Sequence, residues 1–123
     1  MNPTSPPSAV SARHEIPEEW TWDLRPLYAA AADWEADFAR LDEVAAPVLA
    51  LKGRLDSVEA VGSLLAAETA LDRLLERLHT YAHLRHDEDT TQAEHQGREA
   101  RIRARYAELA AECAWITPEL LSH

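Results

Sequence analysis

Residues 57–86 of the chain have the sequence SVEAVGSLLAAETALDRLLERLHTYAHLRH, and this stretch decides the fold class. Ser57 is a favoured helix N-cap, and Glu59 lies in the first turn, where the helix dipole favours an acid. Apolar residues then recur three and four positions apart, as on one face of an amphipathic helix. They are Val58, Val61, Leu64, Leu65, Leu71, Leu74, Leu75, Leu78 and Ala82. The pattern predicts one helix from residue 58 to about residue 86, roughly 43 Å long at ~1.5 Å per residue.

A second long helix is predicted after Asp87-Glu88-Asp89, which interrupts the apolar pattern. Thr91 and Glu94 have the spacing of a capping box, so we expect Thr91 to start this helix. Because the connection between the two helices is short, they should form an antiparallel hairpin. The apolar face of the second helix consists of Ile102, Tyr106, Leu109, Cys113 and Ile116.

A shorter helix is predicted upstream, with Asp33 as its N-cap. Pro47 should kink or end this helix because proline lacks a backbone N–H, although one more turn can follow. Gly53 is expected to stop it in a left-handed conformation. The helical face before the proline consists of Trp34, Phe38, Leu41, Val44 and Ala45.

Residues 14–28 predict an extended arm, because Pro17 and Pro26 prevent a continuous helix. The arm is too apolar to remain in water, so we expect it to pack on the helices with its aromatic residues as anchors. Stacking of a ligand on Trp20 or Trp22 is the alternative. Residues 1–13 are rich in Pro and Ser and predict a disordered leader.

The fold class is therefore all-α, with an N-terminal extended arm and three helices, the last two long and forming an antiparallel hairpin. The chain has 123 residues, of which 46% are hydrophobic and only 3 are glycine. We expect residues 14–123 to form one helical domain. Thr117-Pro118-Glu119 combines an N-cap with a proline at the first helical position. These residues predict a domain truncated at the start of a further helix.

The formal net charge is −10, which disfavours binding to the phosphate backbone of nucleic acids. The one basic cluster, Arg98, Arg101, Arg103 and Arg105, is offset by Glu94, Glu99 and Glu108. No apolar stretch is long enough to span a membrane, and the first residues lack the features of a secretory signal. With Cys113 as the single cysteine, we expect a cytoplasmic protein.

His79, His83 and His86 lie near one line of the long helix, close to Asp72 and Glu76. Two histidines four residues apart can share a zinc ion, but Thr80 stands where an HExxH motif has its general-base Glu. The sequence also contains no Gly-rich phosphate loop and no nucleophile elbow. We therefore expect structural histidines and no catalytic, cofactor-binding or metal-binding residues, with a small metal site on His79 and His83 as the alternative.

Four segments together resemble the oligoendopeptidase F family within the thimet-type zinc metallopeptidases. Residues 16–24 with Leu27-Tyr28 are similar to its opening Trp-Asp-Leu … Leu-Tyr signature, and residues 51–55 to its Lys-Gly-x-Leu turn. Residues 78–90 resemble its Tyr-Ala … Asp-Thr segment, and residues 117–121 its Pro-Glu-Leu-Leu.

The resemblance implies a non-catalytic N-terminal helical domain that flanks the peptide-binding channel of such an enzyme. The parent would hydrolyse short peptides with zinc-bound water and a Glu base, while this chain carries no HExxH and needs no cofactor itself. Its expected partners are the parent's catalytic domain and, indirectly, peptide substrates. The alternative is a stand-alone helical protein-interaction module.

The long helix is apolar over a wide arc, from Val58 and Leu65 on one flank to Leu74 and Leu78 on the other. A helix with so wide an apolar face is normally buried on several sides. We therefore expect an exposed apolar face, through which the chain would form a homodimer.

Overall fold

The computed structural model of the chain describes residues 11–123, and within this range all regular structure is helical. Two short 3₁₀ turns, Arg13–Glu15 and Glu18–Trp20, precede α1 (Ala31–Ala39) and α2 (Leu41–Leu49). The long helices α3 (Val58–Glu88) and α4 (Ala93–Glu112) follow, and α5 (Ile116–Leu121) comes last. The predicted all-α class and the arrangement of arm, first helical segment and long hairpin are confirmed.

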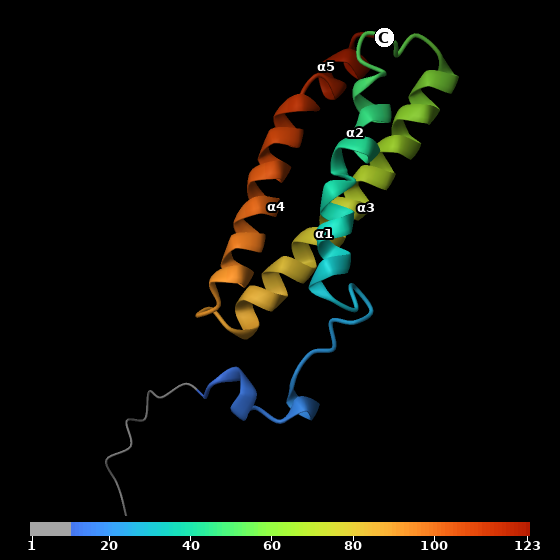
Figure 1. Ribbon diagram of the computed structural model, residues 1–123. Coiled ribbons are helices and arrows are strands. Elements are labelled where there is room, and N and C mark those ends of the chain that lie inside the picture. The colour runs from blue at the N-terminus through green and yellow to red at the C-terminus, as the bar shows by residue number, and fades with distance from the viewer. Residues whose placement is uncertain (1–10) are drawn as a thin grey trace, which may run out of the picture.

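Helix α3 is the centre of the domain. Both α2 and α4 pack along it, and α4 runs antiparallel to it (Figure 1). Helices α1 and α2 continue one another along a second side of α3. None of the helices within residues 11–123 is long and apolar enough to cross a membrane.

Two of the predicted helix boundaries are confirmed. The Ser57 hydroxyl accepts a hydrogen bond from the Ala60 N–H at 3.1 Å and caps α3. Gly53 has a φ of 76°, in the left-handed region that glycine tolerates best. Pro47 lies inside α2, and the interruption between α1 and α2 comes earlier, at Arg40.

Asp33 is not the N-cap of α1, as the sequence predicted. It is the third residue of the helix, and its Oδ2 atom accepts a hydrogen bond from the Ala30 N–H at 3.1 Å. An acid at this position reaches back to the cap residue as in one half of a capping box. The acid therefore stabilises the same helix end from three positions further along.

The predicted caps Thr91 and Thr117 are also wrong. Asp89 accepts hydrogen bonds from the backbone N–H and the hydroxyl of Thr91, and α4 begins only at Ala93. At the other site α5 already begins at Ile116. The chain leaves α4 through a helical turn, so no residue there has the extended backbone of an N-cap.

The arm packs on the helices through Leu24 and Tyr28, which are both buried. The Tyr28 hydroxyl donates a hydrogen bond to Asp37 Oδ2 at 2.8 Å, and its ring meets Tyr81 edge-on at 5.3 Å. The predicted anchors Trp20 and Trp22 are 75% and 66% exposed, so that part of the prediction is wrong. Trp20 and Trp22 only border a hollow beside Leu84 near the end of α3, so most of each side chain remains in solvent.

Residues 1–10 of the predicted leader lie outside the described residues. Its last residue, Arg13, begins a 3₁₀ turn and places its guanidinium 3.3 Å from the Glu88 carboxylate near the end of α3.

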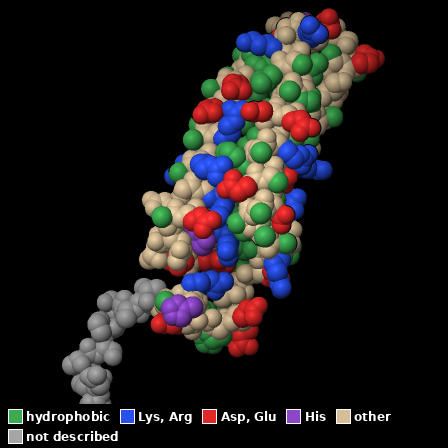
Figure 2. Space-filling model, viewed as in Figure 1, with side chains coloured by type: hydrophobic (Ala, Val, Ile, Leu, Met, Phe, Trp, Pro, Cys, Tyr) green, Lys and Arg blue, Asp and Glu red, His purple; other side chains and the backbone are tan. Residues whose placement is uncertain are grey.

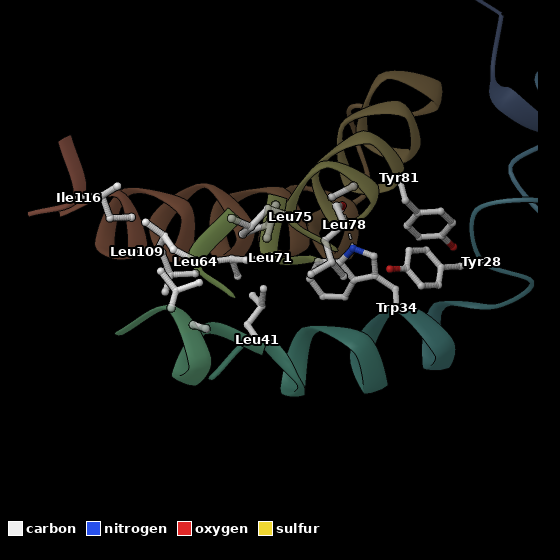
Figure 3. Close-up of a cluster of buried hydrophobic side chains, with 14 of the residues drawn as sticks. Tyr28, Trp34, Leu41, Leu64, Leu71, Leu75, Leu78, Tyr81, Leu109 and Ile116 are labelled. Carbon is white, nitrogen blue, oxygen red and sulfur yellow. Dashed lines mark hydrogen bonds between the residues drawn. The ribbon is translucent and has the colours of Figure 1, made fainter. Parts of the chain in front are cut away.

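Trp34 is fully buried and lies in the part of the core next to Leu78, Tyr28 and Tyr81 (Figure 3). Its indole N–H donates a hydrogen bond to the Leu78 carbonyl of α3 at 2.9 Å. The ring also stacks on Phe38 with 5.0 Å between centroids. Other fully buried residues on three helices continue the core along the hairpin: Leu41, Val48, Leu64, Leu78, Ile102 and Leu109.

Replacing Trp34 with alanine should lower the free energy of unfolding by about 3–5 kcal/mol, because the variant loses a buried ring and leaves a cavity. Trp22→Ala is the matched control and should cost under about 1 kcal/mol, since that ring is largely in solvent. Urea denaturation followed by circular dichroism measures both. Equal losses in the two variants would contradict this description of the core.

Candidate functional site

The three histidines of the sequence pattern lie on α3 beside α4. His83 places Nδ1 3.3 Å from Glu99 Oε1 and Nε2 3.2 Å from Asp87 Oδ2. His86 Nε2 lies 3.6 Å from the other oxygen of Glu99, and the ring of His79 stacks on that of His83 at 5.7 Å. The structure thus brings two of the three histidines to one carboxylate of the neighbouring helix.

Glu99 joins the two long helices at this point. Glu99 is only 7% exposed, and its carboxylate also accepts a hydrogen bond from Arg103 Nη2 at 2.8 Å. Burial raises the pKa of Glu99, but the contact with His83 and the charges of His86 and Arg103 together lower it below the usual range. Glu99 is therefore an ionised carboxylate at neutral pH that holds α3 against α4.

The cluster contains residue types that bind metals, but they are not arranged as a metal centre. Within residues 11–123 no group of three or more His, Cys, Asp and Glu side chains could hold a metal ion. His79 instead lines a groove together with Glu76. The residue after His79 is Thr80, which is not an acid and so cannot serve as a general base. The alternative of a metal on His79 and His83 thus finds no additional ligands in the described part of the chain.

Cys113 is half-buried near the end of α4. Burial raises the pKa of its thiol, and the acids Glu112, Glu68 and Asp72 raise it further. Because the thiolate is the nucleophilic form, a raised pKa makes this thiol less reactive at neutral pH than a free cysteine.

Two hollows flank the hairpin. One, of about 520 Å³, lies between α3 and α4 and is lined by Asp72, Leu75, Glu76, His79, Arg103 and Tyr106. The other, of about 620 Å³, lies under the arm, where Trp22 and Tyr81 line it together with paired charges. In that pocket the Glu88 carboxylate forms ion pairs with the guanidinium groups of Arg13 and Arg85, at nitrogen–oxygen distances of 3.3 and 2.9 Å. Trp22 thus lines a pocket, and ligand stacking on its ring stays a prediction.

The basic cluster is neutralised as the sequence predicted. Ion pairs join Arg98 to Glu94, Arg103 to Glu99 and Arg105 to Glu108. Lys and Arg side chains alternate with Asp and Glu along the face shown in Figure 2. What sequence reasoning missed is that Arg98 and Glu99 are buried. The sequence did contain a signal for this burial: Arg98 and Glu99 precede the apolar Ile102 by four and three positions, and residues at these spacings share a helix face.

Known peptidases resemble this chain over most of its length. It is 32% identical over 111 residues to the plasmid oligoendopeptidase F of Lactococcus lactis subsp. cremoris, a match that covers 89% of this chain and 18% of that protein. Oligopeptidase PepF of Bacillus subtilis is also 32% identical over 111 residues, covering 89% of this chain and 17% of PepF. By sequence, the chain belongs with the oligoendopeptidase F family.

Group B oligopeptidase PepB of Streptococcus agalactiae gives a similar result, 32% identity over 110 residues with 89% of this chain and 18% of PepB covered. The chain thus spans less than a fifth of the length of these relatives. No family model matches the chain, and no solved structure matches it significantly.

The four family-like segments meet in space as two pairs. Tyr28 of the first segment packs edge-on against Tyr81 of the third. Glu119 of the fourth segment accepts hydrogen bonds from the backbone N–H groups of Gly53 and Leu55 in the second, at 2.6 and 3.1 Å. The residues that carry the family resemblance therefore stabilise the fold at the two ends of the hairpin.

Replacing Glu99 with glutamine should cost about 1–2 kcal/mol of unfolding free energy near pH 7, since bonds to charged groups are lost. The pKa of Glu99 is lower in the folded protein than in the unfolded chain, so its carboxylate stabilises the fold above its unfolded pKa of ~4.3. This contribution disappears as the pH falls through the folded pKa. The difference between wild type and Glu99→Gln should therefore shrink below about pH 4.

Urea denaturation at a series of pH values measures the effect. The exposed Glu108, which pairs with Arg105 on the same helix, provides the control, and Glu108→Gln should cost under about 0.5 kcal/mol. A Glu99→Gln difference that does not change with pH would contradict an ionised link.

Proposed function

We propose that this chain is the N-terminal helical domain of an oligoendopeptidase F-like zinc metallopeptidase and forms part of the wall of its peptide-binding channel. The observation that carries the proposal is the match to peptidases over 89% of this chain and only 17–18% of their length. A segment of that size is one domain of a larger enzyme, and here it is a helical hairpin braced by α1 and α2.

In this proposal the catalytic residues and the zinc belong to the remainder of the parent enzyme, which acts on short peptides in the cytoplasm. This chain contributes surface and rigidity. Its sequence has no HExxH motif, so it supplies neither the paired zinc-binding histidines nor the general base of that chemistry.

An apolar hollow at the start of α3 supports contact with the rest of such an enzyme. It has a volume of about 540 Å³, and Leu55, Val58, Val61 and Leu65 line it. Val58 and Leu65 are 85% and 55% exposed, while Leu78 on the opposite flank is buried. The same hollow suits the alternative function, a stand-alone module that binds a partner helix.

A chimera tests the proposed function. Oligopeptidase PepF of Bacillus subtilis, with its matching segment replaced by residues 14–123 of this chain, should still cleave a fluorogenic oligopeptide. Cleavage should stop when a chelator removes the metal, while the isolated chain should cleave nothing with or without zinc. PepF with the segment deleted is the control and should be inactive.

A folded chimera without activity would contradict the proposed function. Zinc-dependent turnover by the isolated chain, persisting after contaminating proteases are removed, would do so as well.

The isolated chain should also form a two-fold dimer through the apolar hollow, because no other part of the parent covers it. Sedimentation at high micromolar concentration should detect the dimer, and Leu65→Glu should convert it to monomer. Trp20→Glu introduces the same charge at another exposed apolar side chain and should leave the dimer intact. A monomeric wild type that binds no apolar dye would favour the stand-alone alternative.

A further inference from the structure

One groove of the hairpin lies outside the packing of α1 and α2. On the side where these helices lie, arginines of α4 reach across to them: Arg101 pairs with Glu35 at 2.7 Å, and Arg105 pairs with Asp42. Arg103 and Tyr106 point from a different face of α4 and line the 520 Å³ groove against α3. None of the residues that line this groove comes from α1, α2 or the arm.

The α3 wall of the groove is acidic and unneutralised. Asp72 and Glu76 line it, and Glu68 lies one turn before Asp72 on the same helix. None of these three carboxylates forms an ion pair with another residue in the range 11–123, although most of the arginines there are paired. The one guanidinium in the groove, that of Arg103, is already bound to Glu99 at 2.8 Å.

The floor of the groove is apolar, and its α4 wall carries the aromatic side chain of Tyr106 beside Arg103. Leu75 forms the floor and is 5% exposed, whereas Tyr106 on the α4 side is 55% exposed. An aromatic face that is open to solvent next to carboxylates favours a cation with an aliphatic stem. The stem covers apolar surface while the charged head meets the acids.

We propose that this groove binds a polypeptide segment in which an Arg or Lys side chain stands next to an apolar one. Charge complementarity selects this occupant. A second copy of the chain would set Glu68, Asp72 and Glu76 against the same acids, and a nucleic acid would bring its phosphates to them. The proposal goes beyond the proposed function, because it also holds if the chain acts on its own.

Binding of designed peptides to the 123-residue chain tests the groove. The probe is acetyl-Leu-Arg-Leu-Arg-Leu-amide, and the matched peptides carry Gln or Glu in place of Arg. Calorimetry should give a dissociation constant of about 1 mM or tighter for the Arg peptide alone, weakening as salt is added. NMR shifts should change at residues 72–79 and 103–106.

Variants separate the groove from the overall negative charge. Asp72→Asn with Glu76→Gln should weaken binding about fivefold or more, since two carboxylates lose a cation. Glu43→Gln with Glu59→Gln removes the same charge from exposed positions outside the groove and should change binding less than twofold. Tyr106→Ala should also weaken binding, and thermal melts should show that all variants remain folded.

Three results would overturn the proposal. The first is no binding of the Arg peptide at several millimolar, and the second is equal weakening in the two double variants. The third is equally tight binding of free arginine amide, which would mean that the groove binds a small cation and not a polypeptide.

Discussion

The hydrogen bond from the Trp34 indole to the Leu78 carbonyl is the constraint around which the domain is built. Placing this ring in the core fixes α1 against the middle of α3. Its polar N–H needs a partner there, because an unsatisfied buried donor is costly. Arg98 and Arg101 of α4 lie over the same ring, at 5.5 and 5.4 Å from its centroid. One side chain therefore sets the positions of three helices.

This arrangement also decides which charges remain available at the surface. Two arginines of α4 face α1 and α2: Arg101 places its guanidinium over the Phe38 ring, 4.6 Å from the centroid, and pairs with Glu35, and Arg105 pairs with Asp42. Arg103 faces the other way and is held by Glu99. Asp72 and Glu76 of α3 on that side form no ion pair with another residue in the range 11–123, so the groove carries unpaired negative charge. The polarity of this groove is thus a consequence of core packing on the opposite side.

Local signals in the sequence predicted the helices, whereas contacts between segments could not be predicted. Ser57 and Gly53 act on their own backbone, so their roles follow from residue type alone. Trp20 and Trp22 are apolar enough to prefer burial, but only the path of the arm decides whether a surface reaches them. Glu99 is the same case in reverse. Its charge predicts exposure, and contacts with His83 and His86 of α3 and with Arg103 make its burial favourable.

The residues that resemble the family also act through contacts between segments. Glu119 binds two backbone N–H groups of the loop at Gly53, and Tyr28 packs on Tyr81, so these family-like residues act by joining distant segments. None of them lines the groove between α3 and α4. Similarity at such positions therefore supports a shared fold strongly, and a shared activity only through the rest of the relatives' length. Whatever this chain binds must instead be read from surfaces that packing leaves free, and the acidic groove and the apolar hollow at the start of α3 are two of these.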